Sequence, residues 1–386
     1  MIDWTKSMKQ TYEFYLVNPL TGLNKQKLTT VTGATVTRDL QSDTQVSGSI
    51  EYDGELNEEY VRIYLVAEQG DEVEKIPLIT MLCQTPSTSF NGKRKSTSIT
   101  GYSPLIELEN VYPPFGYTFP KYTSQTNQEN SKSLDKLIPR LCRENMRMDV
   151  LDISEDLSSL TAEVMANAVT TDPGSSWFAV IQSLISNTDY MMRVKEDGVV
   201  YFDKRPNLNK MTPVWTFNTN NSSLLHSDIS IDRDLYNVPN VVEIITTTVD
   251  GVTHSVIVEN TDESSPTSIP SRGRKVVYRE INPSQLSRTS ARNSQETIRN
   301  YAYKVLEQFN TLEYRISYSH GYCGVNIGDA VYINYPDAGL EFAKAIVVSQ
   351  KIDCKTGCTV EETAVFTKSL YRRGGATTYE SGRKSS

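Results

Sequence analysis

The chain has 386 residues and a formal net charge of −8, with 22% charged and 38% hydrophobic residues. This composition excludes a disordered chain, and the length accommodates two to four domains. The negative charge argues against a general nucleic-acid binder, because phosphate neutralisation needs clustered lysine and arginine. Short basic runs at 93–95, 272–275 and 372–373 lie among serine, threonine and glycine, and we interpret them as solvated loop charges.

The sequence carries no signal for membrane insertion or secretion. No stretch approaches the roughly 18 apolar residues that span a bilayer. The first residues, Met1–Thr5, lack the basic and then apolar layout of a signal peptide. The odd number of cysteines favours reduced thiols, so we expect the chain to fold in a cytoplasm. The five cysteines are Cys83, Cys142, Cys323, Cys354 and Cys358.

Residues 1–105 are predicted to form a first β-barrel, completed by about 211–240. Val61, Ile63 and Leu65 alternate with other side chains, which is the pattern of a strand with one buried face. An Asn-Gly pair at 91–92 is a strong hairpin signal. The strands are expected at 12–18, 46–52, 60–67, 76–83 and 96–102.

Residues 106–210 are predicted to be an inserted α+β domain. An irregular loop at 110–132 leads to apolar residues at helical spacing, where Pro139 should kink or split the helix. A second helix follows a serine cap, with Trp177, Val180, Ile181 and Leu184 on one face. A hairpin over 190–203 then turns at an Asp-Gly pair.

Residues 241–370 are predicted to form a second β-barrel that contains a helix at 294–309. A hairpin at 241–258 turns at another Asp-Gly pair, and the composition of 260–274 indicates a mobile loop. The tail at 371–386 is too polar to bury a core, and we expect it to be flexible. Further strands are expected at 312–320, 329–335, 342–351 and 359–367. The predicted fold class is therefore mainly β, with two barrels and an α+β insert.

The sequence offers few groups for catalysis. His226, His254 and His320 lie beside different predicted strands, and no nucleophile-elbow motif accompanies them. Glycoside hydrolysis needs two nearby carboxylates, but 47 acidic residues guarantee such pairs by chance. We therefore predict no catalytic residue. The acidic candidates considered are Glu107, Glu109, Asp152, Glu155 and Asp156.

Cys354 and Cys358 are the best candidates for a metal site. Their spacing suits zinc, and Cys323 with His320 could complete four ligands. We favour a simpler interpretation, in which Lys355–Gly357 is a hairpin turn with a cysteine at each end. No glycine pattern for phosphate binding occurs. The sequence thus predicts no metal-binding or cofactor-binding residue.

Three segments together resemble the hub proteins of phage tail baseplates, including XkdQ-like and tail-associated proteins. Ser176–Ile185 followed by Tyr190–Phe202 is similar to their helix and Asp-Gly hairpin. Asp228–Val242 is similar to their entry into a second barrel, with a Pro-Asn-x-Val pattern. Val325–Ile333, which contains Gly328 and Asp329, is similar to the segment that closes that barrel.

The resemblance implies two tail-tube-like barrels in each chain, with the α+β domain inserted. Three chains would form a ring that joins the sixfold tail tube to a threefold spike. The implied partners are other copies of the chain, the tail tube or distal tail protein, the central spike or a tail fibre, and the tape-measure protein. DNA would pass through without specific binding, and assembly would occur in a bacterial host cytoplasm.

Three alternatives remain open from the sequence. The chain could be a structural module of a non-contractile tail, a tail-associated peptidoglycan hydrolase, or a carbohydrate-binding β-protein. The absence of a signal peptide counts against the last of these. The acidic, tyrosine-rich composition suits a conduit for DNA, because like charge repels the phosphate backbone.

Overall fold

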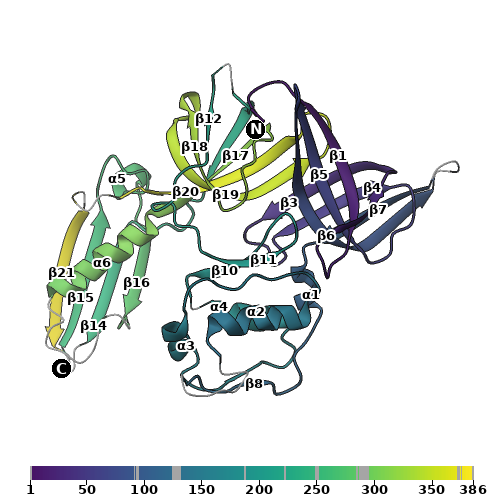
Figure 1. The fold of residues 1–386 in the computed structure, drawn as a ribbon. Coiled ribbons are helices and arrows are strands. Elements are labelled where there is room, and N and C mark those ends of the chain that lie inside the picture. The colour runs from purple at the N-terminus through teal and green to yellow at the C-terminus, as the bar shows by residue number, and fades with distance from the viewer. Residues whose placement is uncertain are drawn as a thin grey trace. The chain divides into compact units, whose positions relative to one another are not determined.

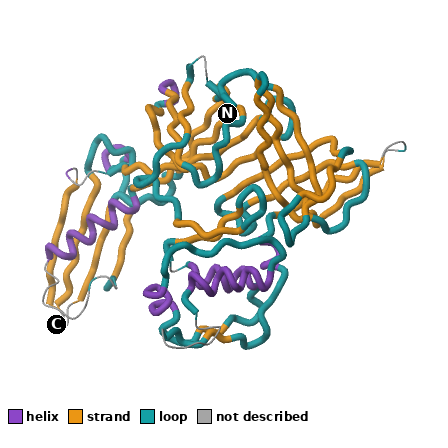
Figure 2. Tube along the Cα trace, viewed as in Figure 1, coloured by secondary structure: helices purple, strands orange, loops and turns teal. Residues whose placement is uncertain are grey.

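The computed structural model describes residues 2–90, 92, 95–123, 132–186, 188–220, 223–247, 252–283, 286, 295–371, 374 and 376–384. Strands predominate over helices (Figure 2), so the predicted mainly β class with an α+β insert is confirmed. The chain divides into two compact units. Unit 1 comprises 1–229 and 317–364, and unit 2 comprises 230–316 and 365–386.

The first strands of unit 1 follow the prediction, with two additions that the sequence analysis missed. They pair in the order β3-β4-β7-β6-β5-β1-β2. The missed strands, β2 and β3, are short of large apolar residues. The elements are β1 (Lys9–Val17), β2 (Asn24–Leu28), β3 (Val31–Asp39), β4 (Val46–Tyr52), β5 (Tyr60–Gln69), β6 (Glu72–Phe90) and β7 (Lys95–Tyr102).

The last part of the chain joins the same sheet. β19 pairs antiparallel with β3, from Ser349 opposite Asp39 to Asp353 opposite Thr35, and continues the order as β13-β17-β20-β19-β3. β12 pairs with β18, and β18 with β19. The unit boundary falls inside β13, β17 and β20. These elements are β12 (Trp215–Asn218), β13 (Leu225–Arg233), β17 (Thr311–Gly321), β18 (Ala330–Tyr335), η2 (Pro336–Ala338), β19 (Leu340–Asp353) and β20 (Thr359–Ser369).

The insert within unit 1 has its own hydrophobic core between helices and short strand pairs. Ser176 caps α4 as predicted, since its hydroxyl accepts from the Ala179 amide (3.2 Å). α2 continues through Pro139 instead of splitting. The elements are α1 (Leu105–Glu109), β8 (Thr118–Phe119), α2 (Leu134–Asn145), α3 (Ser158–Val164), β9 (Val169–Thr170), α4 (Trp177–Ile185), β10 (Tyr190–Val194) and β11 (Val200–Lys204). Within the described ranges, no helix has the length and apolarity needed to cross a membrane.

Unit 2 is a four-stranded sheet in the order β16-β14-β15-β21, with α6 across one face (Figure 1). Val242, Ile244, Val256 and Val258 point to α6 and form the core with its apolar stripe. The elements are β14 (Val241–Thr247), β15 (Val252–Asn260), α5 (Ile269–Arg272), β16 (Val277–Ile281), α6 (Gln295–Phe309) and β21 (Ala376–Lys384).

Strand pairing divides 241–370 differently from the single second barrel that we predicted. The strands between 241 and 281 form the sheet of unit 2, whereas β18 and β19 belong to unit 1, because β19 pairs with β3. The tail also differs from the predicted flexible segment. It forms β21, which pairs antiparallel with β15 from Ala376 opposite Asn260 to Lys384 opposite Val252.

The loop predicted to be mobile at 260–274 is packed. Four of its polar side chains, Asn260, Ser265, Thr267 and Ser268, are buried, and Asn260 donates to Ser265 (3.0 Å) while Thr267 donates to Asn310. Composition alone misleads here, because buried polar groups that satisfy each other cost little. The predicted turns at 91–92 and 250–251, and the first residue of the predicted helix at 294, lie at least partly outside the described residues.

Gly48 of β4 and Gly101 of β7 lie opposite each other, and the Met81 side chain packs against both. A Cβ added at Gly101 would lie 2.9 Å from the Leu82 carbonyl oxygen, whereas one added at Gly33 in β3 would meet nothing closer than 3.4 Å. We expect Gly101→Ala to lower the free energy of unfolding by about 1–3 kcal/mol. Gly33→Ala should stay within about 1 kcal/mol of the unchanged protein. Urea denaturation of both variants tests this, and equal effects would contradict it.

Candidate functional site: a charged junction in unit 1

Residues Val325–Asp329, in the third segment that carries the resemblance, form a tight loop that we name the Gly-Asp loop. The Asn326 amide donates to Asp329 Oδ2 (2.8 Å), which closes the turn on itself. The Gly328 amide donates to the Val347 carbonyl (2.7 Å), which ties the loop to β19. Gly328 has a φ of 85°, a conformation that side chains other than glycine rarely adopt.

Arg193 of β10 holds the Gly-Asp loop from the side of the insert. Its guanidinium donates to the Ile327 carbonyl, and its Nη1 lies 3.8 Å from Asp203 Oδ2. A Cβ at Gly328 would lie 2.6 Å from Arg193 Nη1. Glycine is therefore needed at this position for two reasons, the backbone conformation and the approach of the guanidinium.

Arg38 of β3 meets the loop from the large sheet. It is 2% exposed, and its Nη2 donates to the Leu78 carbonyl of β6 (2.7 Å). Its Nη1 donates to the side chains of Asn326 and Gln350. Glu196 lies 3.9 Å from Nη2 and supplies the nearby negative charge that a buried guanidinium needs.

The Asp-Gly turn of the β10–β11 hairpin docks on β5 and β6. The Thr80 hydroxyl donates to the Glu196 carbonyl (2.9 Å), and Arg62 Nη2 donates to the Asp197 carbonyl (2.6 Å). Gly198 packs so closely that an added Cβ would lie 2.8 Å from Met148 Cε. The predicted hairpin is therefore one of the parts of the insert that contact the sheet.

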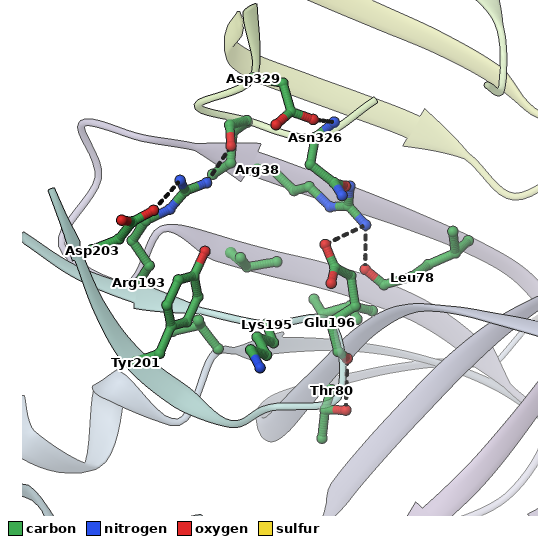
Figure 3. A pocket seen from close by; sticks show the side chains of 14 residues that line it. Arg38, Leu78, Thr80, Arg193, Lys195, Glu196, Tyr201, Asp203, Asn326 and Asp329 are labelled. Carbon is green, nitrogen blue, oxygen red and sulfur yellow. Dashed lines mark hydrogen bonds and ion pairs between the residues drawn. The ribbon is translucent and has the colours of Figure 1, made fainter. Parts of the chain in front are cut away.

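These groups surround a polar cavity of 230 Å³ (Figure 3). Three cationic side chains face three carboxylates, so the lining is close to neutral and favours neither anions nor cations strongly. The geometry provides no nucleophile beside a base, and its chemistry is that of a joint between three parts of unit 1. The charged lining residues are Arg38, Arg193, Lys195, Glu196, Asp203 and Asp329.

Burial sets the ionisation of two groups at this cavity. It raises the pKa of the Asp329 carboxyl, against the opposing effects of the Asn326 amide and the Arg193 charge. It also raises the pKa of the Tyr201 hydroxyl, so that the phenol stays neutral. The sequence analysis selected Asp329 through its motif but missed Arg38 and Arg193, which carry no local signal.

The three histidines occupy separate places. His226 lies in β13 with its Nδ1 3.0 Å from the Ser319 hydroxyl, and His254 belongs to β15 of unit 2. His320 is buried in β17, where its Nδ1 donates to the Gly321 carbonyl (2.7 Å) and its Nε2 lies 3.2 Å from Glu362. Cys323 Sγ lies 3.8 Å from Nδ1.

The Cys323, His320 and Glu362 side chains therefore form a cluster with the composition of a hydrolytic triad. All three are buried, and Tyr318 and Gln350 donate to the same Glu362 carboxylate. Burial raises the pKa of the Cys323 thiol, which keeps it protonated and a poor nucleophile. We interpret the cluster as a satisfied polar group inside the sheet. Glu362 gave no signal in the sequence.

Cys354 and Cys358 flank the turn at Lys355–Gly357, as the simpler interpretation predicted. Both are buried beside Tyr12, and burial raises the pKa of each thiol, that of Cys358 to about 11. They are not joined with His320 and Cys323 into one cluster. Among the residues that the structure describes, no group of three or more histidine, cysteine, aspartate or glutamate side chains is arranged so that it could hold a metal ion.

Most of the acidic candidates are held by other polar groups instead of pairing with each other. Glu107 contacts Arg147 (2.5 Å), Asp152 contacts Arg143 (2.8 Å), and Glu155 contacts Lys204 (2.7 Å). Asp156 accepts a hydrogen bond from the Ser158 amide (2.8 Å). For Glu109, burial raises the pKa of the carboxyl group. Four of these five carboxylates are therefore engaged by a partner other than a second carboxylate.

No protein-family model and no curated protein matches the chain. Its fold is similar to that of the tail protein from Neisseria meningitidis MC58, with a TM-score of 0.56 and 10% identity over 92% of this chain and 97% of that chain. The 43 kDa tail protein of prophage MuSo2 from Shewanella oneidensis gives a TM-score of 0.57 and 10% identity over 92% and 98%. The chain thus has a fold found in these two tail proteins, one of them from a prophage, which agrees with the resemblance to tail proteins.

The two reasons for glycine at position 328 can be separated by mutation. Gly324 has a φ of 79° but open space around it, so Gly324→Ala carries the conformational cost alone, about 1–2 kcal/mol. Gly328→Ala adds the clash with Arg193 and should lose a further ~1–3 kcal/mol. Urea denaturation measures both values. Equal losses would show that the guanidinium does not constrain the loop.

The raised pKa of Asp329 predicts a pH dependence. The folded state holds this proton more tightly than the unfolded state, so the contribution to stability is present at low pH and is lost as the pH rises through about 4 and above. The unchanged protein should therefore lose stability relative to Asp329→Asn as the pH rises above the ordinary aspartate pKa of about 4.

Glu13 provides a control of opposite sign. Hydrogen bonds from Lys27 and Lys75 lower its pKa to about 2, so its contribution is present above the unfolded pKa and is lost as the pH falls. As the pH rises, the free energy of unfolding of the unchanged protein should increase relative to that of Glu13→Gln. Urea denaturation at several pH values measures both differences, and a difference for Asp329→Asn that is constant or of reversed sign would contradict the account.

Proposed function

We propose that the chain is a structural protein of a phage or phage-like tail, located at the baseplate hub or tail tip. The observation that carries this proposal is the fold likeness to two tail proteins over 92% of the chain. The likeness extends over almost the whole of both relatives, at 97% and 98%. Both β units and the insert therefore contribute to it.

The proposed assembly is a homotrimer. Each copy brings two β units, so three copies supply six modules, which match the sixfold tail tube on one side and a threefold spike on the other. Contacts between different surfaces of identical chains close into rings when the rotation fits. Such a ring would also cover sheet edges that a single chain leaves open.

The proposed partners follow from this position. The ring would contact the tail tube or distal tail protein, the central spike or a tail fibre, and the tape-measure protein. DNA would pass through without specific binding, because a chain with a net charge of −8 repels phosphate. Assembly would take place in the host cytoplasm.

The proposed role is mechanical and not enzymatic. The joint around the Gly-Asp loop suits it, because the Arg62 guanidinium bonds the large sheet to the Asp197 carbonyl of the insert, and the Arg193 guanidinium bonds the insert to the Ile327 carbonyl of the loop. The buried Cys323, His320 and Glu362 cluster and the ion-paired acidic residues support the same view.

Light scattering behind a sizing column tests the proposal. We expect a mass near three times the 43.4 kDa of one chain, and negative-stain images of the same peak should show a threefold ring with a central hole. A monomer without rings, unchanged when the tail-tube and spike proteins of the same particle are added, would overturn the hub assignment.

A further inference from the structure

The His320 cluster, formed by Tyr318, His320, Cys323, Gln350 and Glu362, lies where three strands of unit 1 meet. β17, β20 and β19 are neighbours in that order in the large sheet (Figure 1). The side chains of His320 and Glu362 are 1% and 0% exposed. Burial at this level is costly for ionisable groups unless each polar atom has a hydrogen-bonding partner. The donors and acceptors of the cluster therefore determine where its hydrogens lie.

One nitrogen of the His320 ring must carry a hydrogen. Nδ1 lies 2.7 Å from the Gly321 carbonyl oxygen, and a carbonyl oxygen can only accept. The Cys323 sulfur lies 3.8 Å from the same nitrogen and offers at most a weak contact. Nδ1 is therefore protonated, and Nε2 has a free lone pair unless the ring binds a second proton.

The Gln350 amide is oriented by Arg38. A guanidinium has no acceptor, so Arg38 Nη1 must face the amide oxygen, at 3.2 Å. The amide nitrogen then donates to the Val325 carbonyl (2.8 Å) and to Glu362 Oε2 (2.7 Å). Both hydrogens of the amide are used, and a rotated amide would turn them toward the guanidinium.

The Glu362 side chain is arranged as a carboxylate. The Tyr318 hydroxyl donates to Oε1, and the Gln350 amide donates to Oε2. Burial raises the pKa of the Tyr318 hydroxyl, so the phenol keeps its hydrogen. His320 Nε2 lies 3.2 Å from the same Oε2. A hydrogen must lie between these two atoms, because otherwise two lone pairs would face each other.

This hydrogen is a proton that His320 and Glu362 share. On Nε2 it gives an imidazolium beside a carboxylate, and on Oε2 it gives two neutral side chains. The net charge of the pair is zero in both cases. Without the proton, the pair would hold a single negative charge inside the sheet, which is costly.

Within the described part of the chain, Glu362 has no ion pair other than the one with His320. The Phe217 ring of β12 packs on the imidazole, with ring centroids 4.6 Å apart. The Arg38 guanidinium is separated from Glu362 by the Gln350 amide. The other titratable groups that face the pair carry no positive charge, and they are Tyr318, Cys323 and Asp329.

We infer that the proton shared by His320 and Glu362 is a pH-sensitive latch on residues 321–325, the segment that leads into the Gly-Asp loop. His320 holds the first residue of this segment, and Gln350, which also donates to Glu362, holds the last. Loss of the proton sets a lone pair against a buried carboxylate, so the contact opens and the segment is held less firmly. The latch operates within one copy and is independent of the proposed trimer.

The direction of the pH effect follows from the number of bound protons. In an unfolded chain, glutamate is ionised above about pH 4.3 and histidine is neutral above about pH 6.5. Between these values the closed and opened pairs hold equal numbers of protons. Above about pH 6.5 the closed pair holds one more, so the latch weakens as the pH rises. One proton changes the opening equilibrium by at most about tenfold for each pH unit.

Nitrogen-15 NMR of the imidazole groups tests the shared proton without a substitution at Glu362. In the folded protein, the His320 signals should stay constant from about pH 5 to about pH 7.5, with Nδ1 protonated throughout, and a His320→Gln variant assigns them. The histidine signals of the urea-unfolded chain should change over this range. A folded His320 that changes as the unfolded residues do would overturn the inference.

Hydrogen exchange tests the latch itself. The Gly321 and Tyr322 amides donate to the Leu224 and Cys358 carbonyls (both 3.1 Å), so their exchange reports on the segment. Their protection, relative to the intrinsic exchange rate at each pH, should fall by up to about tenfold per pH unit between about pH 7 and pH 9. The protection of 61–65 in β5 should change less. Protection at Gly321 and Tyr322 that does not vary with pH would show that the proton does not hold the segment.

Glu362→Gln separates the latch from general effects of pH. The amide has nearly the same shape but cannot share the proton, so the protection of Gly321 and Tyr322 should be lower at pH 6 and should not depend on pH above about pH 7. Glu361→Gln is the matched control, because Glu361 is the exposed neighbour in β20 that pairs with Lys351 (3.1 Å). It should keep the pH dependence of the unchanged protein. An equal pH dependence in Glu362→Gln would overturn the inference, and the two measurements on the unchanged protein decide if this variant does not fold.

Discussion

The pairing of β3 with β19 is the constraint on which unit 1 depends. Residues 35–39 and 349–353 lie more than three hundred positions apart, yet they are neighbours in one sheet. Further bonds extend the seam, from the Leu40 amide to the Val348 carbonyl (2.8 Å) and from the Cys354 amide to the Ala34 carbonyl (3.1 Å). The cost of closing such a long loop grows only slowly with its length, so a few strand bonds and their packing can offset it.

The seam also positions the charged junction. Arg38 and Gln350 are directly opposite each other across it, and the two side chains are hydrogen-bonded (3.2 Å). Arg38 then reaches Asn326, while Gln350 donates to the Val325 carbonyl (2.8 Å) and to Glu362 (2.7 Å). One cross-strand pair thus links the Gly-Asp loop to the buried His320 cluster. The insert is held through the same place, because Glu196 lies beside Arg38.

The sequence predicted those elements whose burial pattern is local. The alternation of Val61, Ile63 and Leu65 predicts β5. The apolar face of α4 and its serine cap predict that helix. β3 was missed because its buried positions include Ala34 and Arg38 beside Val36, so the apolar alternation is broken. The seam itself has no local signal in the sequence. Because the pairing of β3 with β19 was not predicted, residues 241–370 were predicted to form one barrel, whereas the structure divides them between two units.

The candidate site shows the same limit. Gly328 and Asp329 were selected because their pattern resembles a family motif, and the structure adds the physical reason, an approaching guanidinium and a buried carboxylate. Arg38, Arg62 and Arg193 could not be selected, because an isolated arginine in a strand usually faces solvent. Their roles depend on which backbone carbonyls the tertiary fold brings near them.

The joint in unit 1 has two supports. Arg38, which lies in the seam, donates to Asn326 of the Gly-Asp loop, while Arg62 and Thr80 of β5 and β6 donate to carbonyl groups of the β10–β11 turn. The proposed mechanical role rests on both supports.

Hydrogen–deuterium exchange of the intact protein tests the seam most directly. The amides of 35–39 and 349–353 should exchange as slowly as those of 61–65, which lie in the middle of the same sheet. Rapid exchange of 35–39 and 349–353, at the rate of the exposed turn at 18–23, would contradict the account, because the two ends of the chain would then not be joined.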